Sequence, residues 1–276
     1  MKRPFQAPAN PERLMPFTDH LEELRFRLIR AILGLAVGAA VCLPFQREIF
    51  HLLMRPLLAA LGNEPMIALG VADLFWTYLK VALLGGLFLA SPWVFYQLWA
   101  FIAPGLHSHE RKLAIPFIAS TTFFFVSGAA FGYFLLMPVA FKYLLSFSDE
   151  YVKATLDVQR NFGFALQLLI VFGLVFELPV ILTLLAKLGI VDAPKLRRFR
   201  RYWVVVAFAI GAIATPTPDA VTQTFASLPL IALYEVGIVS AQLFGRKPLD
   251  PDAADGRDAP PRPGGGPPGA QPTRTT

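Results

Sequence analysis

Long stretches without charged side chains run through the chain and are separated by short, charge-rich segments. Residues 81–109 and 113–141 contain no Asp, Glu, Lys or Arg, and residues 161–186 contain only Glu177. Each stretch exceeds the roughly 20 apolar residues with which an α-helix crosses the hydrocarbon core of a bilayer. Three shorter charge-free stretches cover 31–46, 202–218 and 220–234. This pattern is typical of a multi-span α-helical membrane protein.

Six transmembrane helices account for the pattern with the fewest elements. The expected spans cover about 24–45, 73–101, 113–137, 161–187, 202–215 and 220–243. Proline inside a helix removes one backbone hydrogen bond and bends the helix. Four prolines lie in or near these spans, namely Pro92, Pro116, Pro179 and Pro229. The expected fold class is therefore an all-α membrane protein whose six helices form a curved bundle.

The fifth expected span is short. Its roughly 14 helical residues reach about 21 Å at about 1.5 Å per residue, whereas the hydrocarbon core is about 30 Å thick. Either neighbouring helices cover this mismatch, or the bilayer thins locally or a partner docks there.

Composition narrows the class further. Of the 276 residues, 55% are hydrophobic and 16% are charged, whereas about a quarter of the residues in a soluble domain are charged. These values exclude a water-soluble globular protein and a disordered one. The single cysteine, Cys42, excludes a disulfide framework.

The basic residues indicate the orientation of the spans. Of the 25 Lys and Arg residues, 19 lie in the N-terminal segment, the connections after spans two and four, and the C-terminal segment; five lie on the opposite side and Lys80 lies within a span. The positive-inside rule then places both termini in the cytoplasm. Residues 1–16 are expected to be a flexible N-terminal segment, 17–245 the transmembrane domain, and the Pro/Gly-rich residues 246–276 a disordered cytoplasmic tail.

Glu177 is the most unusual single residue, because it lies in the middle of an expected span, two residues before Pro179. A carboxylate at membrane depth costs several kcal/mol unless it is protonated, paired or in contact with water. Three interpretations remain open from the sequence: a hydrogen bond to another helix of the chain, a polar site for a partner helix, or a proton relay.

Two carboxylates stand out on the strongly basic cytoplasmic side, Glu23 and Glu110. Glu23 and Arg27 have the i, i+4 spacing of a helical ion pair, which explains Glu23 locally. The alternative is that Glu23 and Glu110 together recognise two guanidinium groups, because a carboxylate pairs with arginine in a bidentate geometry that lysine lacks.

Several motifs resemble the TatC family, the large membrane subunit of the twin-arginine protein translocase. The residues that carry the resemblance are the run His20-Leu21-Glu22-Glu23-Leu24-Arg25-Phe26-Arg27-Leu28, the run 91–106, His109-Glu110-Arg111-Lys112, Phe176-Glu177-Leu178-Pro179, and the turn 215–219 followed by Gln223. They extend over about residues 15–245 in the order of the family. The turn has one residue more than the expected Thr-Pro-Pro-Asp.

The resemblance implies a cup-shaped protein of six transmembrane helices in the cytoplasmic (inner) membrane, and it assigns roles to individual residues. Binding of the twin-arginine signal peptide is implied for Glu23, Glu110, Arg25, Phe101, Leu106 and Arg111. Glu177 matches the polar residue on the concave face of the family, and Gln223 the region that contacts single-span TatA- and TatB-like subunits. Pro56 in the first outer loop and Asp219 in the last also match.

No energy-converting or catalytic motif is present in the sequence: it has no Gly-x-x-x-x-Gly-Lys-Ser/Thr loop and no nucleophile elbow. The expected protein is therefore not an enzyme and uses no cofactor, metal or nucleic acid. The resemblance implies transport of folded proteins driven by the proton-motive force, with TatA- and TatB-like subunits, signal peptides, membrane lipid and further copies of this chain as partners. A proton-coupled transporter of a small solute, with Glu177 as the coupling carboxylate, is the main alternative; an intramembrane enzyme lacks the catalytic residues it would need.

Overall fold

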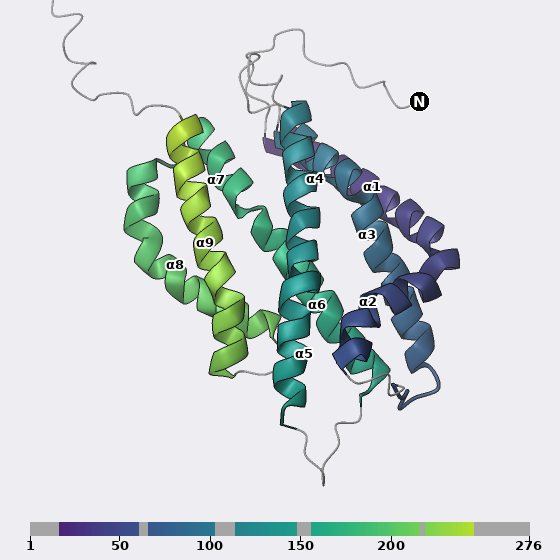
Figure 1. Cartoon of the computed structure of the whole chain (residues 1–276). Helices are drawn as coiled ribbons and strands as arrows, with labels where there is room; N and C mark the ends of the chain where they lie inside the picture. Colours follow the sequence, from purple (N-terminus) through teal and green to yellow (C-terminus); the bar gives the residue numbers. More distant parts are fainter. Residues whose placement is uncertain (1–16, 61–65, 103–113, 148–155, 216–218, 246–276) are drawn as a thin grey trace, which may run out of the picture.

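The computed structural model describes residues 17–60, 66–102, 114–147, 156–215 and 219–245 (Figure 1). Within these ranges the chain is helical and forms no strand, only one isolated bridge between Ile67 and Asp157. The prediction of an all-α membrane protein is confirmed. The expected flexible segment 1–16 and tail 246–276 lie outside the described residues, so the division of the chain into domains stays a prediction.

The helices form one bundle in which α5 continues the direction of α4, and α7 that of α6 (Figure 1). They are α1 (Phe17–Cys42), α2 (Gln46–Ala60), α3 (Asp73–Ile102), α4 (Ala114–Phe131), α5 (Met137–Leu145), α6 (Val158–Phe176), α7 (Leu178–Lys187), α8 (Ala193–Ala214) and α9 (Ala220–Phe244). A 3₁₀ turn at Leu43–Phe45 joins α1 to α2, and a π-helical turn at Gly132–Leu136 joins α4 to α5. The start of α1 and the end of α9 lie at the same end of the bundle.

Five stretches of the described chain are long and apolar enough to cross a membrane: His20–Ala59, Asp73–Ile102, Ala114–Leu145, Val158–Lys187 and Ala220–Phe244. The fifth expected span, 202–215, is not among these five stretches and coincides with the second half of α8. The helix itself begins at Ala193, but its first half contains five basic residues: Lys195, Arg197, Arg198, Arg200 and Arg201. The apolar part of α8 is therefore short, whereas its neighbour α9 has the full length of a span.

Helix α2 was not expected. It places Phe50, Leu53, Met54 and Leu57 in the core at the i, i+3, i+4, i+7 spacing of an amphipathic helix. Pro56 was expected in an outer loop. It lies instead inside helix α2, so the expected loop conformation is wrong. The apolar face of α2 explains the difference, because burying that face against the bundle stabilises a helix where a loop was expected.

The four prolines affect their helices differently. Pro92 leaves the carbonyl of Phe88 without its helical partner, and the Ser91 hydroxyl donates to that carbonyl at 2.8 Å. Pro229 also lies within a helix, α9, and Pro179 follows the break between α6 and α7. Pro116 lies in the first turn of α4, where a backbone N–H has no helical partner. The expected bend at Pro116 is therefore not required.

Close helix contacts hold the bundle together. Helix α1 packs along α3, α4 packs against α6, and α7 and α8 both pack against α9. The largest fully buried side chains include Met54, Leu57, Phe162, Leu168 and Phe172. They belong to α2 and α6 and form one cluster with buried residues of α3, α4 and α5, so the core lies next to α6, the helix that ends just before Glu177.

The crossing of α1 and α3 depends on two glycines. A Cβ atom at Gly38 would lie 2.7 Å from the carbonyl oxygen of Gly86, and a Cβ atom at Gly86 would meet the backbone of Ala39. Small residues allow helices to approach this closely in lipid. Gly34, one helical turn before Gly38, leaves room in the same way for the ring of Trp93 of α3, so both glycines of α1 serve packing within the chain at this crossing.

Replacing Gly86 with alanine is expected to lower the free energy of unfolding by about 1–3 kcal/mol, because overpacking against rigid backbone forces the helices apart. Gly163→Ala in α6 is the matched control. Among the described residues, no atom beyond its chain neighbours and the backbone of its own helix lies within 4 Å of a Cβ atom at that position, so this substitution should raise stability by up to about 1 kcal/mol. Thermal unfolding of the purified chain in detergent measures both changes; equal effects would contradict the close crossing.

Candidate functional site

Glu23 lies in the second turn of α1 and is held by Arg27, one helical turn further along. The Arg27 guanidinium donates through Nε at 3.0 Å and Nη2 at 2.7 Å, both to Oε1 of Glu23. The predicted i, i+4 ion pair is confirmed. Oε2 of Glu23 is buried and has no hydrogen-bond partner in the described part of the chain. One oxygen of this carboxylate is therefore fixed by Arg27, while the other is desolvated and has no donor among the described residues.

An aromatic contact joins this part of α1 to the end of α3. The rings of His20 and Phe101 are stacked, with centroids 4.4 Å apart and an interplanar angle of 19°. Glu23 follows His20 by three residues and so lies on the same helix face. Arg25 is exposed and, two residues from Glu23, points in a different direction. The structure thus brings Phe101 towards the Glu23 face.

His20 and Arg27 are the two neighbours of this site that the sequence reasoning did not assign to it. His20 could be found only through its contact with α3. Three expected site residues, Leu106, Glu110 and Arg111, lie outside the described residues. Helix α3 ends at Ile102 and α4 begins at Ala114, so the chain that contains these three residues connects helix ends at the same end of the bundle as Glu23 (Figure 1).

Glu177 occupies the break between α6 and α7. Its side chain is only 5% exposed, and its Oε1 is buried without a hydrogen-bond partner in the described residues. Pro179 has no backbone N–H to donate to the carbonyl of Val175. That carbonyl instead accepts from the backbone N–H of Glu177. The polar atom at the break that lacks a partner among the described residues is Oε1 of the Glu177 carboxyl group.

Gln223 and Asp219 belong to the first turn of α9. Asp219 caps this helix by accepting from the backbone N–H of Thr222 at 2.8 Å. The Gln223 side-chain amide donates to the carbonyl of Phe208 at 2.9 Å, which ties α9 to α8. Within the described chain no hydrogen bond joins Gln223 to Glu177, which lies at the middle of its span. Their assignment to one intramembrane site for a partner helix stays a prediction.

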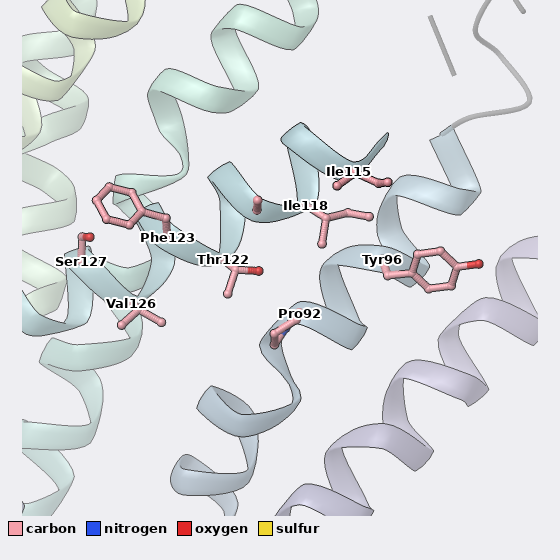
Figure 2. A pocket seen from close by; sticks show the side chains of 9 residues that line it. Pro92, Tyr96, Ile115, Ile118, Thr122, Phe123, Val126 and Ser127 are labelled. Atoms are coloured by element: carbon pink, nitrogen blue, oxygen red, sulfur yellow. The ribbon is translucent and has the colours of Figure 1, made fainter. Parts of the chain in front are cut away.

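A groove of about 700 Å³ lies between α3 and α4. Figure 2 shows Pro92 and Tyr96 of α3 on one side, and Ile118 and Thr122 of α4 on the other. Tyr96 is the only ionisable residue in its described lining. The groove therefore offers an apolar surface without a constellation for acid–base or nucleophilic chemistry. Among the described residues, no group of three or more His, Cys, Asp or Glu is placed to hold a metal ion.

Comparison with known proteins gives a consistent result over most of the chain. The family model of the Sec-independent protein translocase protein TatC matches residues 19–229. TatC of Desulforapulum autotrophicum is 41% identical over 237 residues, which cover 86% of this chain and 87% of that protein. TatC of Escherichia coli K12 is 37% identical over 234 residues, 84% of this chain and 90% of that protein.

The fold agrees with this similarity. The crystal structure of a twin-arginine translocase receptor, TatC, superimposes with a TM-score of 0.74 at 37% identity, covering 82% of this chain and all of that one. These proteins are translocase components, a transport function and not an enzymatic one. With the helical bundle, the helix-break carboxylate and the matches over residues 19–229, the chain belongs to the TatC family of Sec-independent protein translocase subunits.

Proposed function

We propose that this chain is the receptor for twin-arginine signal peptides and the core subunit of a translocase that exports folded proteins across the cytoplasmic membrane. The observation that carries the proposal is the state of Glu23: Arg27 fixes Oε1, and Oε2 is buried and unpaired. A guanidinium of the cargo peptide is the natural donor for Oε2, because its planar N–H groups match a carboxylate better than an ammonium does.

The free energies of the interactions at Glu23 favour binding of a cargo guanidinium. An i, i+4 ion pair on a helix contributes only about 0.2–0.5 kcal/mol. Arg27 therefore orients Glu23, and breaking their pair during peptide binding costs little free energy. A buried acceptor without a donor costs about 1–3 kcal/mol, and a cargo arginine removes that cost. Glu23 can therefore bind a guanidinium of the cargo peptide in addition to that of Arg27.

The second arginine of the signal peptide is assigned to Glu110. Leu106 and Arg111 in the same segment, together with Phe101 and Arg25, complete the proposed binding surface. The support for this arrangement is the stacking of His20 on Phe101, since it brings the α1 face with Glu23 to the end of α3, directly before the segment with Glu110. The orientation with both termini in the cytoplasm is proposed from the distribution of Lys and Arg.

Glu177 and Gln223 are proposed to serve the partner subunits. Single-span TatA- and TatB-like helices would meet an unsatisfied carboxyl group at Glu177 and, at α8, a helix with a short apolar part. Gln223 acts indirectly by tying α9 to α8, and Asp219 by capping the start of α9. Pro56 shapes the outer end of the bundle through α2. We further propose that several copies of the chain assemble in the receptor complex and that the proton-motive force drives transport.

Reconstituted vesicles test the proposal. Vesicles that contain this chain with TatA- and TatB-like subunits should import a folded twin-arginine cargo when a proton gradient is applied, and should reject the same cargo with two lysines. Without partners and cargo, the chain should show no solute-dependent proton flux. Such a flux would favour the small-solute transporter, and import that does not distinguish arginine from lysine would contradict the receptor.

A further inference from the structure

A second cavity, separate from Glu23 and from the α3–α4 groove, lies where α7 and α9 face the end of α3 and the start of α4. Its volume is about 270 Å³. Most of its lining is apolar, including Trp99, Phe117, Phe124, Val180, Val236 and Phe244. The cavity is in the same half of the bundle as the start of α1 and the end of α9 (Figure 1).

The depth of this cavity matches one leaflet of a bilayer. Both Pro179 and Lys187 of α7 line it, and the eight residue steps from one to the other correspond to about 12 Å of helix. Half of a hydrocarbon core of about 30 Å is about 15 Å. The cavity therefore extends from the headgroup level, where α7 ends, towards the middle of the membrane near the α6–α7 break.

Lys187 is the only ionisable residue in the described lining of the cavity. Its Nζ lies 5.6 Å from the centroid of the Phe244 ring, and no carboxylate forms an ion pair with it in the described part of the chain. Basic residues at the cytoplasmic ends of transmembrane helices attract anionic headgroups. A cation at the mouth of an apolar cavity suits a ligand with an anionic head and an apolar chain.

The hydroxyl groups in the lining need no polar ligand. Thr183 and Ser240 are hydrogen-bonded to each other at 2.6 Å, and Ser120 donates to the carbonyl of Pro116 at 2.7 Å. The interior of the cavity therefore accepts hydrocarbon without leaving these groups unsatisfied.

The cavity combines an apolar interior with a single cation in its described lining, Lys187. We propose that the cavity binds one acyl chain of an anionic phospholipid, whose phosphate accepts a hydrogen bond from the Lys187 ammonium. The α3–α4 groove has no cation in its described lining and so has no basis for selecting an anionic lipid.

Native mass spectrometry of the purified full chain with phosphatidylglycerol or phosphatidylcholine tests the headgroup contact. Phosphatidylglycerol should bind more tightly than phosphatidylcholine. Lys187→Gln should weaken its binding about fivefold, the factor that corresponds to about 1 kcal/mol per basic residue at a lipid surface, and Lys187→Arg should retain it. Lys142→Gln is the matched control, because Lys142 also lies in the last turn of a helix, α5, at the other end of the bundle.

Fluorescence quenching tests the position of the chain. In a variant that keeps only Trp99 of the four tryptophans, phosphatidylglycerol with brominated acyl chains should quench the emission, and Ser120→Phe should reduce this quenching by filling the cavity. Equal binding by wild type and Lys187→Gln, or full competition by inorganic phosphate alone, would overturn the proposal. So would unchanged quenching in Ser120→Phe. None of these outcomes depends on twin-arginine recognition, and thermal unfolding confirms that each variant is folded.

Discussion

Replacing Glu23 with glutamine is expected to weaken binding of a twin-arginine peptide to the purified chain by about ten- to a hundredfold. Hydrogen bonds to a charged group contribute about 1.5–3 kcal/mol, and glutamine removes the charge while keeping the size of the side chain. Affinity for the twin-lysine version of the peptide should change by less than about threefold, because lysine gains no bidentate contact that could be lost. Fluorescence anisotropy of the labelled peptides measures both values.

Glu22→Gln is the control for this experiment. Glu22 is the neighbouring residue on α1 and is exposed, so the substitution makes the same change in net charge without touching the Glu23–Arg27 pair. A similar loss of affinity in both variants would mean that the peptide responds only to the overall charge of this surface. The specific role of Glu23 would then be wrong.

Replacing Glu177 with leucine is expected to abolish most export while leaving the chain as stable as before or more stable. Its Oε1 is buried without a partner in the described residues, and such a group costs about 1–3 kcal/mol. An apolar side chain of similar size removes this cost but also removes the polar group that is proposed to contact a partner helix. Thermal unfolding measures the stability, and photocrosslinking to the single-span subunits measures the contact.

Glu235→Gln provides the comparison for Glu177. Glu235 lies in α9 and forms a bidentate pair with Arg200, with both side chains substantially exposed. Such a pair contributes about 0–1 kcal/mol, so its loss should change stability little and leave export and crosslinking intact. If Glu177→Leu also leaves crosslinking and export intact, the carboxyl group has no role in partner contact.

The transmembrane architecture could be predicted from the sequence because the bilayer imposes a simple length rule. Charge-free runs such as 81–109 and 113–141 exceed that length, and they correspond to α3 and to α4 with α5. Helix α2 was missed because Arg47, Glu48 and Arg55 interrupt its apolar residues. Its helical period becomes evident only when the buried positions Phe50, Leu53, Met54 and Leu57 are read at i, i+3, i+4 and i+7.

The candidate sites were predictable only where the partners are close in sequence. The Glu23–Arg27 pair follows from helical spacing, and the helix break at Glu177 follows from the proline two residues later. The stacking of His20 on Phe101 and the bond from Gln223 to the Phe208 carbonyl connect different helices. No local pattern contains this information, because tertiary packing determines which helix faces meet.

The most direct test of the account is a double-mutant cycle between Glu23 and the arginines of the peptide. Six affinities are measured, those of wild type and Glu23→Gln for a twin-arginine peptide and for the two versions in which one arginine is replaced by lysine, and they give one cycle for each arginine. The account predicts a coupling energy of about 1–2 kcal/mol between Glu23 and one of the two arginines. A coupling energy of zero for both arginines would contradict the account, provided that thermal unfolding shows the Glu23→Gln variant to be folded.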